Sequence, residues 1–115
     1  MGKQDDGSRT ELLPGTLYLL ILKTLARLGP MHGYGIAQFI QETTEDALQV
    51  EEGSLYPALQ RMLIKGWVAA EWGQSENNRR ARYYRLTPAG RKQLGVEVSE
   101  FEKVVQAIHR VIKPA

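Results

Sequence analysis

The most apolar segment of the chain begins near Pro14 and stops at Gly29. Leucine and isoleucine lie on almost every side of a helix built over it, and proline and glycine suit its first turn and its end. A helix without a polar face is covered on more than one side. In a chain this short, we expect one cover to be a second subunit, contacted by Leu17 and Ile21.

Two further helices are predicted by apolar residues at helical spacing. The second covers residues 33–42, and the third lies between Ser54 and Gly66, with Ser54 as its N-cap and Pro57 in its first turn. Leucines and a methionine share one side of the third helix. The remaining surface of this helix carries the side chains Ser54, Tyr56, Pro57, Gln60, Arg61 and Lys65.

A hairpin is predicted after the third helix. Residues 67–72 and 81–86 are rich in Trp, Tyr, Val and Ala, and a polar loop separates them. This pattern is typical of two antiparallel strands joined by a loop. The side chains at or beside the tip are mostly basic, namely Asn78, Arg79, Arg80 and Arg82.

A long last helix is predicted from Thr87, as N-cap, to Ile112. Its apolar residues recur at alternating spacings of four and three, which is the seam of a coiled coil. The seam consists of Leu94, Val98, Phe101, Val105, Ile108 and Ile112. The rest of the chain offers little surface to cover it, so we expect a homodimer. The alternative is a seam packed on the first helix of the same chain.

Three helices, a hairpin and a final helix predict a mainly α (α+β) fold. This order is the winged helix-turn-helix, with a two-stranded wing and a C-terminal dimerisation helix. We expect a flexible tail over residues 1–11, a DNA-binding domain over 12–87 and the dimerisation helix over 88–115.

Composition narrows the function. The chain has 115 residues, of which 43% are hydrophobic, enough for one compact core. It contains no cysteine, which excludes disulfides and thiol chemistry. No metal-ligand spacing or glycine-rich phosphate loop occurs, so we expect no enzyme activity, metal or cofactor. No secretory signal or membrane-spanning run is visible, which favours a cytoplasmic protein without membrane contact.

The distribution of charge favours DNA as the partner. The net charge is only +2, but residues 51–92 are clearly basic while residues 1–50 are acidic. In a major groove, Gln60 can pair with adenine and Arg61 with guanine. Ser54 at the start of its helix can direct backbone N–H groups to a phosphate, and the hairpin tip can lie along phosphates or enter the minor groove.

Other interpretations of these residues stay open at this point. The polar helix face and basic tip also fit a solvated surface, a protein-interaction module or a ligand sensor without specific DNA binding. Trp67 and Trp72 suit a small-molecule pocket, although core packing is the more frequent role of a strand aromatic. His32, in the turn before the second helix, suits a phosphate contact or a helix cap.

Three segments of the chain form a distinctive set: LPGTLYLLILKTLARLGPMHGYGIAQFI, EEGSLYPALQRMLIKGW and RRARYYRLTPAGRKQL. Through them the chain resembles the PadR family of transcriptional regulators over about residues 12–95. The resemblance implies a dimeric repressor that binds double-stranded DNA. In some relatives a small aromatic effector releases the repressor from the DNA. The positions of this chain that match the family's DNA-binding motifs are Tyr34, Ser54, Tyr56, Pro57, Arg61, Arg80, Arg82 and Tyr84. The exposed-side Ile64 departs from the acidic residues common in this region of the family.

Overall fold

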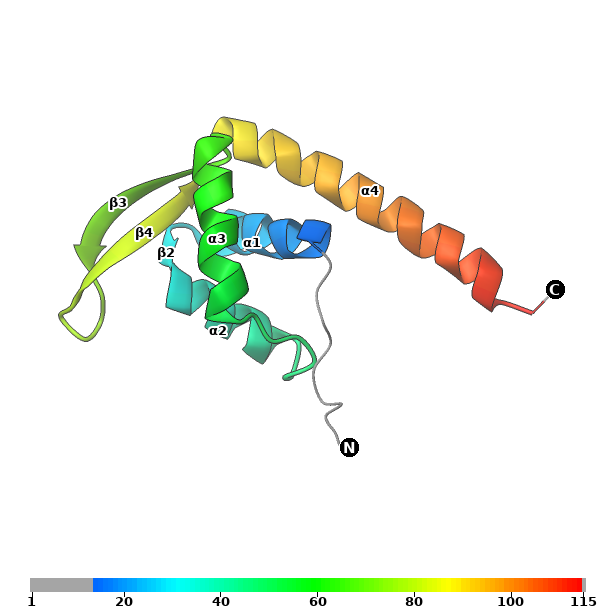
Figure 1. The fold of residues 1–115 in the computed structure, drawn as a ribbon, viewed down its shortest axis with the longest axis horizontal. Coiled ribbons are helices and arrows are strands. Elements are labelled where there is room, and N and C mark those ends of the chain that lie inside the picture. The colour runs from blue at the N-terminus through cyan, green and yellow to red at the C-terminus, as the bar shows by residue number, and fades with distance from the viewer. Residues whose placement is uncertain (1–13, 115) are drawn as a thin grey trace.

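The computed structural model describes residues 14–114. In this part of the chain, four helices pack with a three-stranded antiparallel sheet, and the last helix extends away from the rest (Figure 1). The elements are α1 (Pro14–Leu28), β2 (Met31–His32), α2 (Gly33–Thr43), α3 (Glu52–Ile64), β3 (Val68–Gln74), β4 (Arg80–Leu86) and α4 (Pro88–Ile112). The predicted winged helix-turn-helix is therefore confirmed. The predicted tail, residues 1–11, lies outside the described residues, and the boundary between 12–87 and 88–115 stays a prediction.

The turn between α1 and α2 is built by a glycine and a histidine. Gly29 has φ +84°, a left-handed conformation that ends α1 without steric strain. His32 is the N-cap of α2, and its Nδ1 accepts a hydrogen bond of 3.0 Å from the N–H of Gly35. The capping role expected for His32 is therefore confirmed.

The helix α3 starts two residues earlier than its predicted cap. The carbonyl of Glu51 accepts hydrogen bonds from the N–H groups of Ser54, at 3.0 Å, and Leu55, at 2.9 Å. Ser54 as an N-cap is therefore wrong, and so is a phosphate contact through its backbone N–H, because that donor is used inside the helix. Pro57 lies in the helix interior rather than in the first turn. It removes one intrahelical hydrogen bond to the carbonyl of Gly53.

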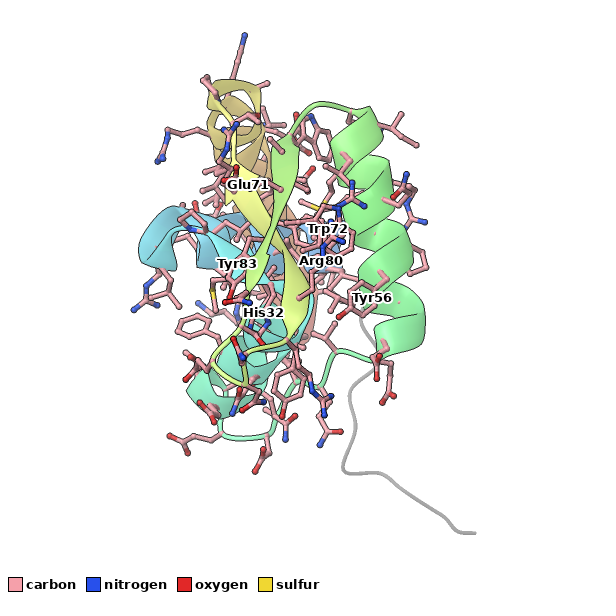
Figure 2. All side chains as sticks on the ribbon, turned by 90° about the vertical axis from the view of Figure 1, so that its left-hand side faces the viewer. His32, Tyr56, Glu71, Trp72, Arg80 and Tyr83 are labelled. Carbon is pink, nitrogen blue, oxygen red and sulfur yellow. The ribbon has the colours of Figure 1, made fainter. Side chains whose placement is uncertain are left out.

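The hairpin is longer and its tip shorter than predicted. Strands β3 and β4 have seven residues each, and together with the loop 75–79 they form the wing, seen edge-on beside α3 in Figure 2. The Ser75 N–H donates to the Arg79 carbonyl at 2.8 Å, and Asn78 closes the turn with φ 59°. A third strand, β2, pairs with β4. Two residues are too few to show a strand period, so the sequence did not predict it.

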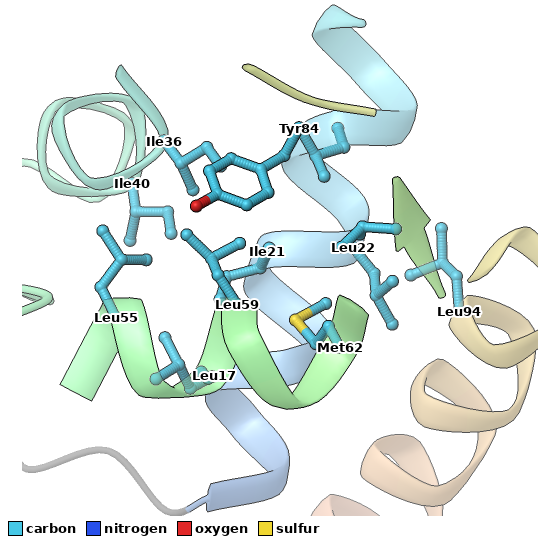
Figure 3. Close-up of a cluster of buried hydrophobic side chains, with 13 residues drawn as sticks. Leu17, Ile21, Leu22, Ile36, Ile40, Leu55, Leu59, Met62, Tyr84 and Leu94 are labelled. Atoms are coloured by element: carbon cyan, nitrogen blue, oxygen red, sulfur yellow. The ribbon is translucent and has the colours of Figure 1, made fainter. Parts of the chain in front are cut away.

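The core lies where α1 crosses α2, α3 and the base of the wing (Figure 3). Ile21 is 0% exposed and Leu17 is 6% exposed within this single chain. Their predicted contact with a second subunit is therefore wrong. The chain's own α2, α3, α4 and β4 pack against α1 and bury these two residues.

The seam of α4 is divided between two environments. Leu94 is buried in the core and Val98 packs against it, close to α1. Leu94 was predicted to contact a second subunit and is instead buried in its own domain. Val98 is only partly buried, so its contact with a second subunit stays a prediction. Beyond them α4 leaves the domain, and Phe101 and Ile108 lie exposed on its surface.

Candidate nucleic-acid interface

The predicted DNA-contacting side chains are all exposed. They come from the start of α2, from α3 and from the wing, and each of them keeps an exposed surface. They are Tyr34, Ser54, Tyr56, Pro57, Gln60, Arg61, Lys65, Asn78, Arg79, Arg80 and Arg82. Every one of them is therefore accessible to a macromolecular partner.

An open groove of about 920 Å³ lies between the wing and α2, and α3 contributes Tyr56 to its lining. Aromatic rings and guanidinium groups line it together, and Figure 2 shows Tyr56 of α3 directed toward the wing, with Trp72 and Arg80 between them. Its side chains include Tyr34, Tyr56, Trp72, Arg79, Arg80 and Arg82. Cations and flat aromatic rings in an open groove suit a nucleic acid, because its phosphates are anionic and its bases and sugars are rings.

The Tyr56 ring packs α3 against the start of α2. A Cβ atom placed on Gly33 would lie 2.7 Å from the Tyr56 ring, so the ring contacts the glycine backbone directly. Burial raises the pKa of the Tyr56 hydroxyl, and the charge of Glu52 and the neighbouring Tyr84 raise it further. The group therefore remains a neutral hydroxyl at physiological pH and can donate a hydrogen bond to a phosphate oxygen.

Arg61 lies on a different flank of α3 from Tyr56. Five residues of helix separate them, which corresponds to about 140° around the helix axis. The Arg61 Nε donates a hydrogen bond of 2.6 Å to the hydroxyl of Tyr18 on α1, and its guanidinium lies 5.7 Å from the centre of that ring. Arg61 and the wing arginines are therefore not neighbours. Gln60 and the 77% exposed Ile64 lie on the side of α3 that points away from the core.

We expect Tyr18→Phe to lower the free energy of unfolding by about 0.5–1 kcal/mol, because the exposed Arg61 loses one hydrogen bond. The aromatic ring and its contact with Trp67, at 5.5 Å between ring centres, are retained. Chemical denaturation of Tyr18→Phe, Arg61→Ala and the double variant measures the coupling. Additive effects would show that the contact contributes nothing.

The two tryptophans have different roles. Trp67 is half-buried, packs against the core and carries the Lys65 ammonium 5.2 Å from its ring centre. Trp72 is 58% exposed on the wing, and Arg80 lies 4.6 Å from its ring centre. Core packing, the more frequent role of a strand aromatic, is therefore wrong for Trp72. The contact of Tyr18 with Arg61 also escaped prediction, since 43 residues separate them.

Two further observations concern other classes of function. Among residues 14–114, no three metal-ligating side chains of His, Asp or Glu come together. Within the same range, none of the helices combines the length and apolar character needed to span a membrane.

Comparison with known proteins identifies the fold and the family. The structure resembles a transcriptional regulator from Clostridium thermocellum, with a TM-score of 0.78 and 29% identity over 86% of this chain and 95% of that chain. It also resembles a PadR family transcription regulator from Clostridium difficile, with a TM-score of 0.71 and 27% identity over 84% and 98%.

The sequence comparisons agree with the structural ones. An uncharacterised protein from Lysinibacillus sphaericus is 30% identical over 87% of this chain and 91% of its own length. The model of the transcriptional regulator PadR-like family matches residues 21–96, which contain α2, α3 and the wing. The chain therefore belongs to the PadR-like family of transcriptional regulators.

Proposed function

We propose that this DNA-binding regulator is a repressor that binds a palindromic operator as a homodimer. The polar side of α3 enters the major groove, and the wing contacts the backbone or the minor groove. The observation that carries the proposal is the exposure of the predicted contact side chains on α2, α3 and the wing, together with the open groove that wing arginines, Tyr34 and Tyr56 line. A major groove is about 12 Å wide and admits one helix beside such a wing.

Dimerisation through α4 is supported by apolar side chains that the single chain leaves uncovered. Phe101, Ile108 and Ile112 are 45%, 50% and 68% exposed, and Val105 lies between them on the same seam. Contiguous apolar surface on a helix is stabilised by burial against a partner. A second copy of α4 supplies a seam of the same chemistry and gives the two α3 helices a fixed spacing.

A small aromatic effector that releases the DNA belongs to the same proposal, as the family resemblance implies. The regulator would then work in the compartment that holds its DNA. Displacement of a bound fluorescent duplex by planar aromatic compounds tests this part separately. If none of the tested compounds displaces the duplex, control of the repressor by an aromatic effector is contradicted.

The function is tested by titrating fluorescent duplex DNA at increasing salt concentrations. Arg80→Ala is expected to weaken binding to all sequences and to flatten the salt dependence by about one released counterion. Arg61→Ala is expected to weaken binding to the selected operator by roughly fivefold to 100-fold and to relax sequence preference. Binding that is insensitive to salt and to both substitutions would contradict the proposal and favour a protein-interaction module.

A further inference from the structure

An apolar side chain stands exposed in the middle of the basic wing. Trp72 is 58% exposed, although the neighbouring base of the wing packs into the core. The strand register pairs Trp72 with Arg82 and Gln74 with Arg80, so these four side chains share one face of the wing. That face lines the groove opposite Tyr56 (Figure 2).

The Arg80 guanidinium lies over this indole ring. It is 4.6 Å from the ring centre, within the range of a favourable cation–π contact. The contact restricts a long, flexible side chain before any partner arrives, which reduces the entropy lost on binding. Arg82 on the same face adds a second positive charge, so the exposed ring stands in a cationic setting.

We propose that Trp72 and Arg80 form a binding site for the DNA sugar–phosphate backbone, with the indole against a deoxyribose and the guanidinium on the adjoining phosphate. The inference rests on the proposed function and adds a direct contact made by Trp72. A deoxyribose would cover apolar surface of the indole that is exposed to solvent in the free protein. A phosphate would supply the anion that pairs with the Arg80 guanidinium. The contact is independent of base sequence.

Substitution of Trp72 tests the contact through affinity. Trp72→Ala is expected to weaken binding to calf-thymus DNA and to a duplex selected from a random pool by the same factor, about five- to tenfold. Trp72→Phe keeps an aromatic ring and is expected to stay within about twofold of the unchanged protein. In the Trp72→Ala, Arg80→Ala double variant the two losses are expected to be less than additive. Val96→Ala, which truncates an exposed side chain on α4, is the control.

Fluorescence tests the contact directly. In Trp67→Phe the only remaining tryptophan is Trp72. Its emission is expected to change with added calf-thymus DNA in step with the anisotropy of a labelled duplex. Circular dichroism of each variant confirms that it remains folded. If Trp72→Ala does not fold, the emission of Trp72 in Trp67→Phe provides the readout.

The outcomes separate the inference from the proposed function. Salt-dependent DNA binding with constant Trp72 emission, or with full affinity in a folded Trp72→Ala, would overturn this inference and leave the function standing. A change of emission with full affinity in Trp72→Phe and reduced affinity in Trp72→Ala supports it. Absence of any DNA binding would overturn both.

Discussion

Ile108→Glu is expected to convert the protein to a monomer and to weaken binding to a selected palindromic duplex by at least about 100-fold. A carboxylate in the middle of the seam cannot be buried without a large desolvation cost. The monomer then loses the effective concentration that joins two half-site contacts. Stability of the domain should change little, because Ile108 lies beyond the core and is 50% exposed in the single chain.

Analytical ultracentrifugation gives the oligomeric state, and titration of the selected duplex gives the affinity. Gln106→Glu is the matched control, because it adds the same charge two residues away, about 200° around the helix. It is expected to remain dimeric and to keep its affinity for the duplex. A dimeric Ile108→Glu, or a monomer that binds the palindrome with full affinity, would contradict pairing through this seam.

Gly90→Ala is expected to lower the free energy of unfolding by about 3 kcal/mol, because the added methyl group overpacks a closed site. A Cβ atom there would overlap the carbonyl oxygen of Trp67 and would lie 2.9 Å from a Leu86 methyl group. The carbonyl is backbone and cannot rotate away. Thr87 holds the same junction: its hydroxyl donates to the Gly66 carbonyl at 2.6 Å and accepts from the Gly90 N–H at 3.0 Å.

Gly95→Ala in the same helix is the control. Within residues 14–114, no atom outside the chain neighbours and the helix's own backbone lies within 4 Å of a Cβ placed there, and Gly95 is exposed. This variant is expected to be more stable by about 0.5–1 kcal/mol, since alanine favours a helix interior. Denaturant unfolding at one fixed protein concentration compares the variants. Equal stability of Gly90→Ala and the unchanged protein would show that the junction of α4 and the wing tolerates displacement.

Much of the fold could be predicted from the sequence. Gly29 and Thr87 mark element ends by local chemistry that acts within a few residues, and the structure confirms both. The start of α3 could not be predicted in this way, because the carbonyl of Glu51 begins the helix before the serine that looks like its cap. Periodicity found the seam of α4 but did not say where the helix leaves the core.

The sequence predicted which side chains of the candidate site are exposed, but it did not predict which residues those side chains contact. Polar residues at helical spacing identified the outer side of α3, and arginines between two strands identified the wing. The Arg61 contact with Tyr18 depends on how α1 and α3 cross, which no local pattern encodes. Likewise, the exposure of Trp72 follows from how far the wing extends beyond the core, and the composition of the strand favours burial instead.

Selection of bound duplexes from a random DNA pool shows whether two chains bind a two-fold symmetric operator. A homodimer with one α3 in each half-site is expected to enrich an inverted repeat whose half-sites lie about one helical turn apart, or a multiple of it. Arg61→Ala is expected to broaden the selected sequence. Failure to enrich any sequence, or enrichment of a single asymmetric site bound by one chain, would contradict binding of a palindromic operator by a homodimer.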